Sequence, residues 1–346
     1  MKKKKLLFVI TGFKKGGAER QMLNLLNGIK NDFEIQVVGF FDGYYKKEIE
    51  NLGIKVHLIK LKSNLGIFKA VYKVNKITKN FKPDTIQSML PHANIVCKLV
   101  NAINFNKYTI FTGIRNSREP KLLEILEKIT DRSSNKIITN SITNKNALIK
   151  RGFEDNKIQV IYNGINFQEP KEKYHYDKKT ILTVGKFYPQ KDYETNVLVV
   201  EKLSQKRGDF QFLYAGVGPE KEKIANLVKE KNLDNFIKFL GVRDDIPELM
   251  NSADLFFLPT KFEGQANVIL EAMYYNLPIL TTDIPENTEV CEALFGEVGD
   301  INFFAEKINE FLDNKIDFKE KIIINKESIQ NFTVDKMVNE YLKFYK

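Results

Sequence analysis

Two glutamates, Glu263 and Glu271, lie eight positions apart in the stretch EGQANVILE. A pair of carboxylates can act as acid and nucleophile on one bond, as in glycoside hydrolases, where the two groups lie roughly 5 to 9.5 Å apart. Eight residues of helix span about 12 Å, which is too long for that chemistry. The spacing instead suits two contacts at opposite ends of one elongated ligand.

A strand, a loop and a helix are predicted around these glutamates. An apolar run precedes the pair, and residues 267–275 have Val268, Ala272 and Tyr275 at the spacing of a buried helical face. Because asparagine is a favoured capping residue, we expect Asn267 to cap this helix. The amides around the cap are then candidates to bind a phosphate.

Two lysines follow the first predicted strand in the second half of the chain. The stretch VGKFYPQKD places Lys186 and Lys191 in a region that is otherwise net acidic. Cations at such a position are candidates to neutralise a diphosphate, and a solvated loop is the alternative. Gly216, in AGVGPE, follows the next strand. A glycine-rich turn at such a place is a common connection between a strand and a helix.

Near the start of the chain, the stretch TGFKKGGAER joins a predicted strand to a helix. Gly16 and Gly17 allow a ligand to approach the backbone closely, and the helix N-terminus offers amides to an anion. The glycine spacing matches neither the dinucleotide-binding fingerprint nor the P-loop, which argues against a dinucleotide-dependent oxidoreductase and a P-loop kinase. A surface turn without a ligand is the alternative.

Short apolar runs alternate with amphipathic stretches along the chain, which predicts βαβ units and parallel sheets. The series occurs twice, so we expect two doubly wound α/β domains in tandem, with ligands at the carboxyl ends of their strands. Strands are predicted at residues 6–10, 34–40, 55–59, 85–88, 108–112, 136–139, 158–162, 180–184, 210–214, 237–240, 255–258 and 279–282. Helices are predicted at residues 17–30, 66–80, 92–103, 120–132, 142–151, 191–206, 219–231, 245–251, 267–276 and 333–346.

The chain has 346 residues, more than one hydrophobic core usually supports. We expect a first domain at residues 1–165 and a second at residues 166–332, with the helix at 333–346 packing back on the first. Residues 1–160 hold 30 Lys and Arg against 13 Asp and Glu, whereas residues 161–346 hold 24 against 31. The basic first half is expected to face an anionic lipid surface or a polyanion, and a lysine-rich composition without functional meaning is the alternative.

The helix predicted at residues 66–80 carries several lysines, with Phe68 and Tyr72 between them. Such a helix could dock on anionic lipid headgroups, and a solvated face over a core stripe is the alternative. No apolar run approaches the ~20 residues of a membrane-spanning helix. The opening MKKKKLLFVITGFKK has no cleavage site and is interpreted as a basic start before a strand.

The sequence gives no sign of a metal or a disulfide. It contains no D-x-D motif and no cluster of carboxylates or histidines with metal-ligand spacing, so we expect no metal and no other cofactor. Cys97 and Cys291 are far apart in the chain, which suits a reducing cytosol. No nucleic-acid recognition motif is present, so nucleic acid is not an expected partner.

Several of these stretches occur in a recognisable order. They are GGAER at 16–20, YNGIN at 162–166, VGK-x4-KD at 184–192, G-x-G-P at 216–219 and, above all, EG-x2-N-x3-EAM-x3-LP at 263–278. In this order they resemble the motifs of the retaining glycosyltransferases of family 4, and the resemblance covers nearly the whole chain. It implies the GT-B fold, in which two Rossmann-like doubly wound parallel-sheet domains face a central cleft.

The resemblance implies a role for each matching residue. Glu271 is expected to bind the ribose of a nucleotide sugar, and Glu263 to lie beside the transferred sugar. Lys186 and Lys191 are expected to neutralise the departing diphosphate, where negative charge develops. The other implied donor contacts are the amides of Gly264, Gln265 and Ala266 on the sugar, those of Asn267 and Val268 near the phosphate, Gly16 and Gly17 over the diphosphate, Gly216 within the donor site, and Val242 and Arg243 near the base.

Some positions depart from the family pattern or leave their role open. Lys186 stands where arginine is usual, so a point charge replaces a bidentate contact. Arg115 stands where many members have a histidine, and it is a candidate either to contact the sugar or phosphate or to cap Ser117 and Glu119. His92 is a candidate for a donor or acceptor contact, or for a structural hydrogen bond at the start of a helix.

We therefore expect a retaining glycosyltransferase that moves a sugar from a nucleotide-diphosphate sugar, with UDP-sugar preferred, to a glycan or lipid-linked acceptor. The expected product is a cell-surface polysaccharide such as capsule or lipopolysaccharide. The enzyme is expected to be cytoplasmic, or peripheral on the inner face of the plasma membrane, with an anionic membrane surface as a partner. Two other classes stay open: a nucleotide-sugar enzyme of the same fold, such as an epimerase, and a non-catalytic basic adaptor.

Overall fold

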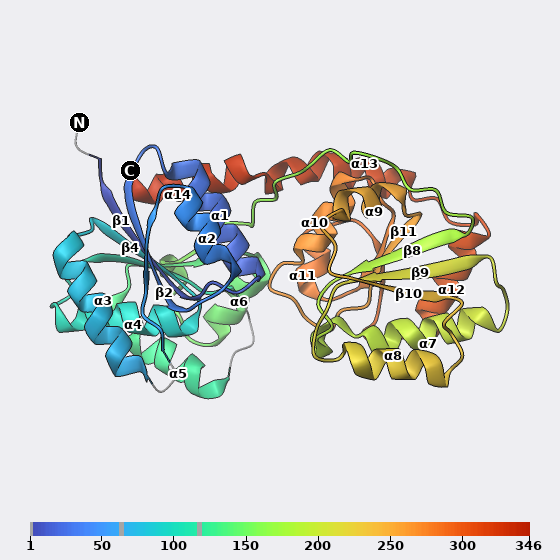
Figure 1. The fold of residues 1–346 in the computed structure, drawn as a ribbon, viewed down its shortest axis with the longest axis horizontal. Helices are drawn as coiled ribbons and strands as arrows, with labels where there is room; N and C mark the ends of the chain where they lie inside the picture. The colour runs from blue at the N-terminus through green and yellow to red at the C-terminus, as the bar shows by residue number, and fades with distance from the viewer. Residues whose placement is uncertain (1–2, 62–65, 116–119) are drawn as a thin grey trace. The chain divides into compact units, whose positions relative to one another are not determined.

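A computed structural model describes residues 3–61, 66–115 and 120–346 and divides into two compact units. Unit 1 comprises Met1–Asn166 and Thr333–Lys346, and unit 2 comprises Phe167–Phe332. Figure 1 shows both units as layered arrangements of helices around a sheet, with the red C-terminal helix α14 beside the blue helix α1. The chain thus leaves unit 1 once and returns to it at its C-terminal end.

The described residues of unit 1 form a seven-stranded parallel sheet in the order β3-β2-β1-β4-β5-β6-β7. The strands are β1 (Lys5–Gly12), β2 (Glu34–Phe41), β3 (Lys55–Leu58), β4 (Thr85–Met89), β5 (Thr109–Gly113), β6 (Lys136–Thr139) and β7 (Ile158–Val160). The helices are α1 (Gly17–Ile29), α2 (Tyr44–Asn51), α3 (Ile67–Phe81), α4 (Pro91–Ile103), α5 (Lys121–Ile129), α6 (Ile142–Lys150) and α14 (Val334–Tyr345). The strand order reverses between β1 and β4, so the loops after these two strands flank the crevice where such sheets bind ligands.

Strand β1 shows why the sheet of unit 1 is covered on both faces. Successive side chains of a strand point to opposite faces. Phe8 and Ile10 join a cluster with α1, α2 and α14, whereas Leu7 and Val9 join a second cluster with α3 and α4. The resulting run is apolar at every position, which is typical of strands buried on both faces.

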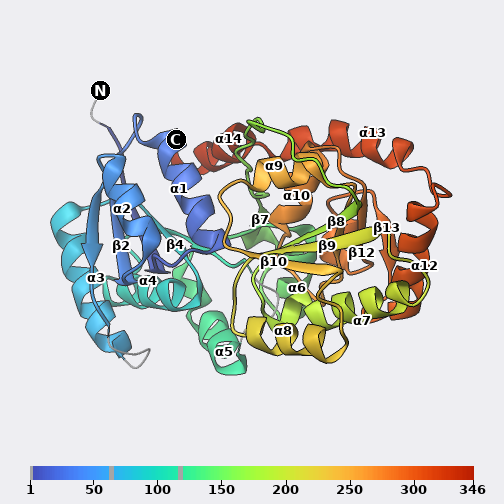
Figure 2. The same cartoon turned by 45° about the vertical axis from the view of Figure 1, so that its right-hand side comes forward.

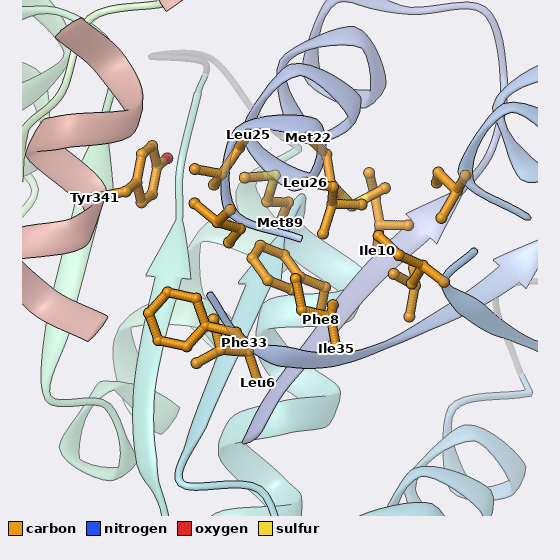
Figure 3. Close-up of a cluster of buried hydrophobic side chains, with 14 of the residues drawn as sticks. Leu6, Phe8, Ile10, Met22, Leu25, Leu26, Phe33, Ile35, Met89 and Tyr341 are labelled. Carbon is orange, nitrogen blue, oxygen red and sulfur yellow. The ribbon is translucent and has the colours of Figure 1, made fainter. Parts of the chain in front are cut away.

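Helix α14 completes the core of unit 1. Tyr341 and Tyr345 are buried in the cluster with α1 and β1, and Figure 3 shows Tyr341 directed toward Leu25 and Leu26. The Tyr345 hydroxyl bonds to Gln87 Oε1 on β4 at 3.0 Å. A Cβ on Gly164 would lie 2.6 Å from Val334 Cα, so glycine allows the outgoing and returning segments to pack backbone against backbone.

The described residues of unit 2 form a six-stranded parallel sheet in the order β10-β9-β8-β11-β12-β13. The strands are β8 (Lys179–Val184), β9 (Phe210–Ala215), β10 (Ile237–Gly241), β11 (Leu255–Leu258), β12 (Ile279–Thr282) and β13 (Leu294–Gly296). The helices are α7 (Tyr193–Ser204), α8 (Lys221–Glu230), α9 (Ile246–Ser252), α10 (Asn267–Tyr274), α11 (Pro285–Thr288), α12 (Ile301–Leu312) and α13 (Lys319–Ser328). The order reverses between β8 and β11, and Figure 2 shows α7, α8 and α12 on one face of this sheet and α9, α10 and α13 on the other.

The sequence located nearly all of these strands but missed several elements. The helices α2, α11, α12 and α13 and the strand β13 were not predicted. The helix α2 buries only Tyr45 and Ile49, so its apolar periodicity is weak, and β13 is only three residues long. The helix α12, in contrast, contributes Phe304 and Ile308 to the core of unit 2. The doubly wound arrangement is as expected.

Candidate functional site

The loops after β8 and β11 meet at the switch point of unit 2. Lys191 Nζ donates to Glu263 Oε1 at 2.5 Å, and the two side chains are only 13% and 7% exposed. Lys186 lies in the same loop as Lys191 and is exposed. Topology brings these loops together, because β8 and β11 are neighbours in the sheet although about seventy residues separate them.

Further bonds brace the two loops against each other. The Thr260 hydroxyl lies 2.8 Å from both Glu263 Oε1 and the carbonyl oxygen of Gln190. The Lys261 amide also donates to the Gln190 carbonyl at 2.7 Å, and Lys261 Nζ lies 3.0 Å from Asp192 Oδ1. Neither Thr260 nor Lys261 was predicted as a site residue. Their position directly after β11 is the only signal that pointed to them.

Glycines let the loops after two neighbouring strands, β8 and β9, approach each other closely in the same region. Gly216 has φ +148°, and a Cβ there would lie 1.9 Å from the carbonyl oxygen of Gly185. A Cβ on Gly218 would lie 2.5 Å from the carbonyl oxygen of Phe187. The loop after β9 therefore supports the loop that carries Lys186 and Lys191. This is a more specific role than that of a turn that only joins a strand to a helix.

The cap of helix α10 lies one residue earlier than predicted. Ala266 occupies the N-cap position, and its carbonyl accepts from the amide of Ile269 at 2.9 Å, so Asn267 is the first helical residue and not the cap. The amides of Asn267 and Val268 still occupy the first turn, where backbone N–H groups have no acceptor within the helix. Gly264 and Gln265 lie in the loop just before the helix.

The buried face of α10 also differs from the prediction. Ile269, Leu270, Ala272 and Met273 are buried, whereas Val268 and Tyr275 are only partly buried. Ala272 is buried as predicted, but the predicted pattern missed Ile269, Leu270 and Met273. Glu271 is partly buried and lies one turn after Asn267, so the two share a face of the helix. That face carries Glu271 and the first-turn residues rather than the core contacts.

The loop after β10 holds a small charged group. Val242 is 58% exposed. The Arg243 guanidinium forms an ion pair with the Asp245 carboxylate, in which Nε donates to Oδ1 at 2.7 Å. The Tyr174 hydroxyl donates to Asp245 Oδ2 at 2.6 Å. Arg243 lowers the pKa of Asp245 to about 2, and the hydrogen bond to Asp245 raises the pKa of Tyr174 to about 12. At neutral pH this group therefore keeps a fixed charge distribution.

In unit 1, Gly16 and His92 follow β1 and β4, the two strands that flank the switch point. Gly16 is the N-cap residue of α1, in an extended conformation, and Gly17 opens the helix. His92 lies at the start of α4 beside a small cavity lined by Phe40, Phe41 and other apolar residues. Burial lowers the pKa of the His92 imidazole, which is therefore neutral at pH 7. No hydrogen bond to its ring occurs within the described residues. The structural hydrogen bond that was the alternative role of His92 is therefore not found there.

Arg115 has structural partners that the sequence did not suggest. Its Nη1 donates to Asn163 Oδ1, and its Nη2 donates to the Tyr341 hydroxyl at 3.1 Å. Ser117 and Glu119, which the sequence offered as groups for capping, lie outside the described residues. The guanidinium thus ties the end of the first segment of unit 1 to α14.

Neither a metal-binding cluster nor a membrane-spanning helix is present among the described residues. No group of three or more His, Cys, Asp or Glu side chains there is arranged to hold a metal ion. Among the helices that the structure describes, none has both the length and the apolar character needed to cross a bilayer.

Comparison with protein families gives two matches that together span most of the chain. The family model described as "Glycosyltransferase Family 4" matches residues 15–169, and the model described as "Glycosyl transferases group 1" matches residues 165–328. The junction between the two matches falls where unit 1 gives way to unit 2.

Curated relatives are similar over most of their length. The capsular polysaccharide biosynthesis glycosyltransferase CapH of Staphylococcus aureus is 23% identical over 303 residues, covering 83% of each chain. An N-acetylgalactosamine-N,N'-diacetylbacillosaminyl-diphospho-undecaprenol 4-alpha-N-acetylgalactosaminyltransferase of Campylobacter jejuni is 23% identical over 301 residues, covering 81% of this chain and 80% of that protein. The O-antigen biosynthesis glycosyltransferase WclY of Escherichia coli is 23% identical and covers 99% of this chain and 98% of that protein.

Solved structures share the fold. Anabaena HepE in complex with UDP and glucose has a TM-score of 0.83 with 20% identity and covers 99% of both chains. TarM has a TM-score of 0.82 with 15% identity and also covers 99% of both chains. At these identities the likeness shows the fold, a GT-B arrangement of two parallel-sheet α/β domains, as the sequence predicted.

Proposed function

The chain belongs to the family 4 glycosyltransferases, and we propose that it transfers a sugar, with retention of configuration, from a UDP-sugar to a glycan or lipid-linked acceptor. The observation that carries the proposal is the Lys191–Glu263 pair, which lies at the switch point of unit 2. A doubly wound sheet binds its ligand at this point. Both side chains are largely withdrawn from water, so their charges are screened less than charges on the surface and interact more strongly with a bound ligand.

The pair has one charge for each end of the breaking bond. An ammonium has three N–H donors, so Lys191 can bond to Glu263 and still offer donors to a diphosphate oxygen. Lys186, exposed in the same loop, adds a second cation for the phosphate that leaves. We assign Glu263 to the sugar side, where a carboxylate stabilises the positive charge that develops at the anomeric carbon. The departing phosphate is assigned to take the acceptor's proton on the same face of the sugar.

The rest of the donor is assigned along α10 and the neighbouring loops. The first-turn amides of α10 suit the phosphate, and Glu271, one turn further along the same face, suits the ribose hydroxyls. The remaining proposed contacts are Gly264, Gln265 and Ala266 for the sugar, Asn267 and Val268 for the phosphate, Val242 and Arg243 for the base, Gly216 within the donor site, and Gly16, Gly17, His92 and Arg115 from unit 1.

We propose that the reaction needs no metal and no other cofactor. Lys186, Lys191 and the helix amides supply the positive potential that a divalent cation supplies in other sugar transferases. The absence of a D-x-D motif from the sequence supports this.

The acceptor is assigned to a cell-surface polysaccharide pathway. CapH and WclY are described as enzymes of capsule and O-antigen biosynthesis, and the Campylobacter relative as acting on a diphospho-undecaprenol acceptor. The basic character of residues 1–160 suits an anionic lipid-linked acceptor. We therefore place the protein in the cytoplasm, at the inner face of the plasma membrane, with no role in nucleic-acid binding.

Release of nucleoside diphosphate from a panel of sugar nucleotides tests this function. UDP release from at least one UDP-sugar, increased by a lipid-linked or glycan acceptor, is the expected result. Conversion of the sugar nucleotide without release of a diphosphate would instead identify an epimerase-like enzyme. If no sugar nucleotide is bound in calorimetry, the adaptor class replaces the proposal.

Replacement of Glu271 by alanine tests the ribose contact. We expect Glu271→Ala to weaken UDP binding about 10- to 100-fold, because hydrogen bonds donated to a charged acceptor are worth about 1.5–3 kcal/mol. Glu230→Ala, an exposed glutamate at the end of α8, is the control and should leave affinity unchanged. Calorimetric titration with UDP measures both. Equal affinity of the wild type and Glu271→Ala would remove the assignment.

A further inference from the structure

The helix α5 turns an apolar face outward. Leu122, Ile125 and Ile129 are 69%, 54% and 67% exposed, and their spacing places them on one side of the helix. The only fully buried residue of α5 is a glutamate, Glu127. A surface helix ordinarily has the opposite arrangement, with its apolar stripe toward the core.

Buried polar contacts hold α5 in this orientation. Glu127 Oε1 accepts from Asn94 Nδ2 at 2.8 Å, and the carbonyl oxygen of Glu127 accepts from Lys98 Nζ at 2.7 Å. Asn94 and Lys98 are on α4 and are fully buried. Because breaking these bonds would leave charged groups without partners inside the protein, α5 cannot turn over to bury its apolar side at low cost.

The charges on the outward side of this segment are positive. Glu124 Oε1 lies 3.6 Å from Arg151 Nη2, and Asp131 Oδ1 accepts a hydrogen bond from Ser134 Oγ at 2.7 Å. Glu127 is buried as well, so the side chains of all three acidic residues between positions 120 and 132 point toward the protein interior or its neighbouring side chains. Lys121 and Arg132, at the two ends of the apolar stripe, are exposed.

The neighbouring helices extend this character. Helices α3, α4 and α5 form one layer on the same side of the sheet of unit 1, with α4 packed against both of the others (Figures 1 and 2). On α3, Phe68 and Tyr72 are 84% and 68% exposed, and Lys69 beside them is exposed as well. The layer therefore presents large apolar side chains among cations at two separate places.

We propose that Leu122, Ile125 and Ile129, with Lys121 and Arg132, form a ridge that inserts into the interface of an anionic lipid bilayer. This combination of apolar side chains flanked by Lys and Arg is what interfacial helices use. A second copy of this chain fits less well, because two such ridges would bring cations against cations. The sequence pointed to the helix at 66–80 alone, whereas the ridge on α5 follows from the burial of Glu127.

Vesicle binding by paired variants tests the ridge. The test variant is Ile125→Gln/Ile129→Gln, and the control is Ile323→Gln/Ile324→Gln on α13, where the isoleucines are 58% and 41% exposed. Cosedimentation with vesicles of phosphatidylcholine and phosphatidylglycerol at low salt gives the partition coefficient. We expect it to fall roughly tenfold or more in the test variant and less than about twofold in the control. A further variant, Lys121→Gln/Arg132→Gln, should weaken binding and flatten its dependence on salt.

Each other outcome overturns the proposal. No binding of the wild type to anionic vesicles would remove it, and so would equal binding of wild type and test variant. Loss of a dimer in sedimentation by the test variant, with vesicle binding intact, would assign the ridge to a second copy. These measurements use no sugar nucleotide, so their failure is distinct from failure of the proposed transferase function.

Discussion

Glu263→Gln is expected to lower the rate of sugar transfer by about two to three orders of magnitude, the loss typical when one preorganised electrostatic contact to a transition state is removed. The amide keeps the shape of the side chain and an oxygen for the Thr260 hydroxyl, which lies 2.8 Å from Glu263 Oε1. It lacks the negative charge that we assign to the sugar side of the breaking bond. Turnover measured by UDP release, compared with UDP affinity by calorimetry, separates the chemical step from binding.

The same substitution is expected to destabilise the protein. Lys191 is 13% exposed on its side chain and would lose its anionic partner, which costs about 3 kcal/mol for a buried pair. Glu194→Gln, which breaks the exposed Lys223–Glu194 pair of the same unit at 3.0 Å, is the control and should cost less than about 1 kcal/mol. Urea unfolding measures both free energies.

A double variant distinguishes the catalytic role from the structural one. Lys191→Gln/Glu263→Gln removes both charges, so we expect the free energy of unfolding to recover by most of the loss in Glu263→Gln. Activity should stay low, because neither the diphosphate nor the sugar regains its charged contact. If activity recovered together with stability, the pair would act only as a brace between the loops after β8 and β11.

The fold was largely predictable because buried parallel strands are continuous apolar runs bounded by turns. Strands β6, β11 and β12 were predicted to the residue. The helix α2 was missed because only Tyr45 and Ile49 of its residues face the core. The family and the enzyme class followed from motifs, which survive in order at strand ends even where overall identity is low.

The details of the site depended on contacts that no local pattern records. The motifs marked Lys191 and Glu263 separately, but only the strand order places them in one ion pair. Asn267 had the right chemistry for a cap, and the backbone of Ala266 took that position instead. Arg115 was considered for the ligand or for capping, while its guanidinium bonds to Tyr341, more than two hundred residues away in the chain. Long-range partners of this kind are set by tertiary packing rather than by propensity.

Gly216→Ala is expected to cost roughly 3–5 kcal/mol of folding stability and to abolish UDP binding. Its φ of +148° disfavours any side chain, and a Cβ would lie 1.9 Å from the carbonyl oxygen of Gly185, where backbone must move to relieve the clash. That movement displaces the loop that carries Lys186 and Lys191, so the donor site is lost together with the stability.

Alanine variants of two other glycines of unit 2 distinguish the cost of backbone strain from the cost of the steric clash at Gly216. Gly241 has φ +71°, and a Cβ added there would meet open space, so Gly241→Ala should show the cost of backbone strain alone, about 1 kcal/mol. Gly208 has neither an unusual φ nor a close neighbour, so Gly208→Ala should be neutral or slightly stabilising. Urea unfolding and UDP titration on all three variants measure the series. If Gly216→Ala lost no more stability than Gly241→Ala, the packing of Gly216 on Gly185 would not be what holds the lysine loop in place.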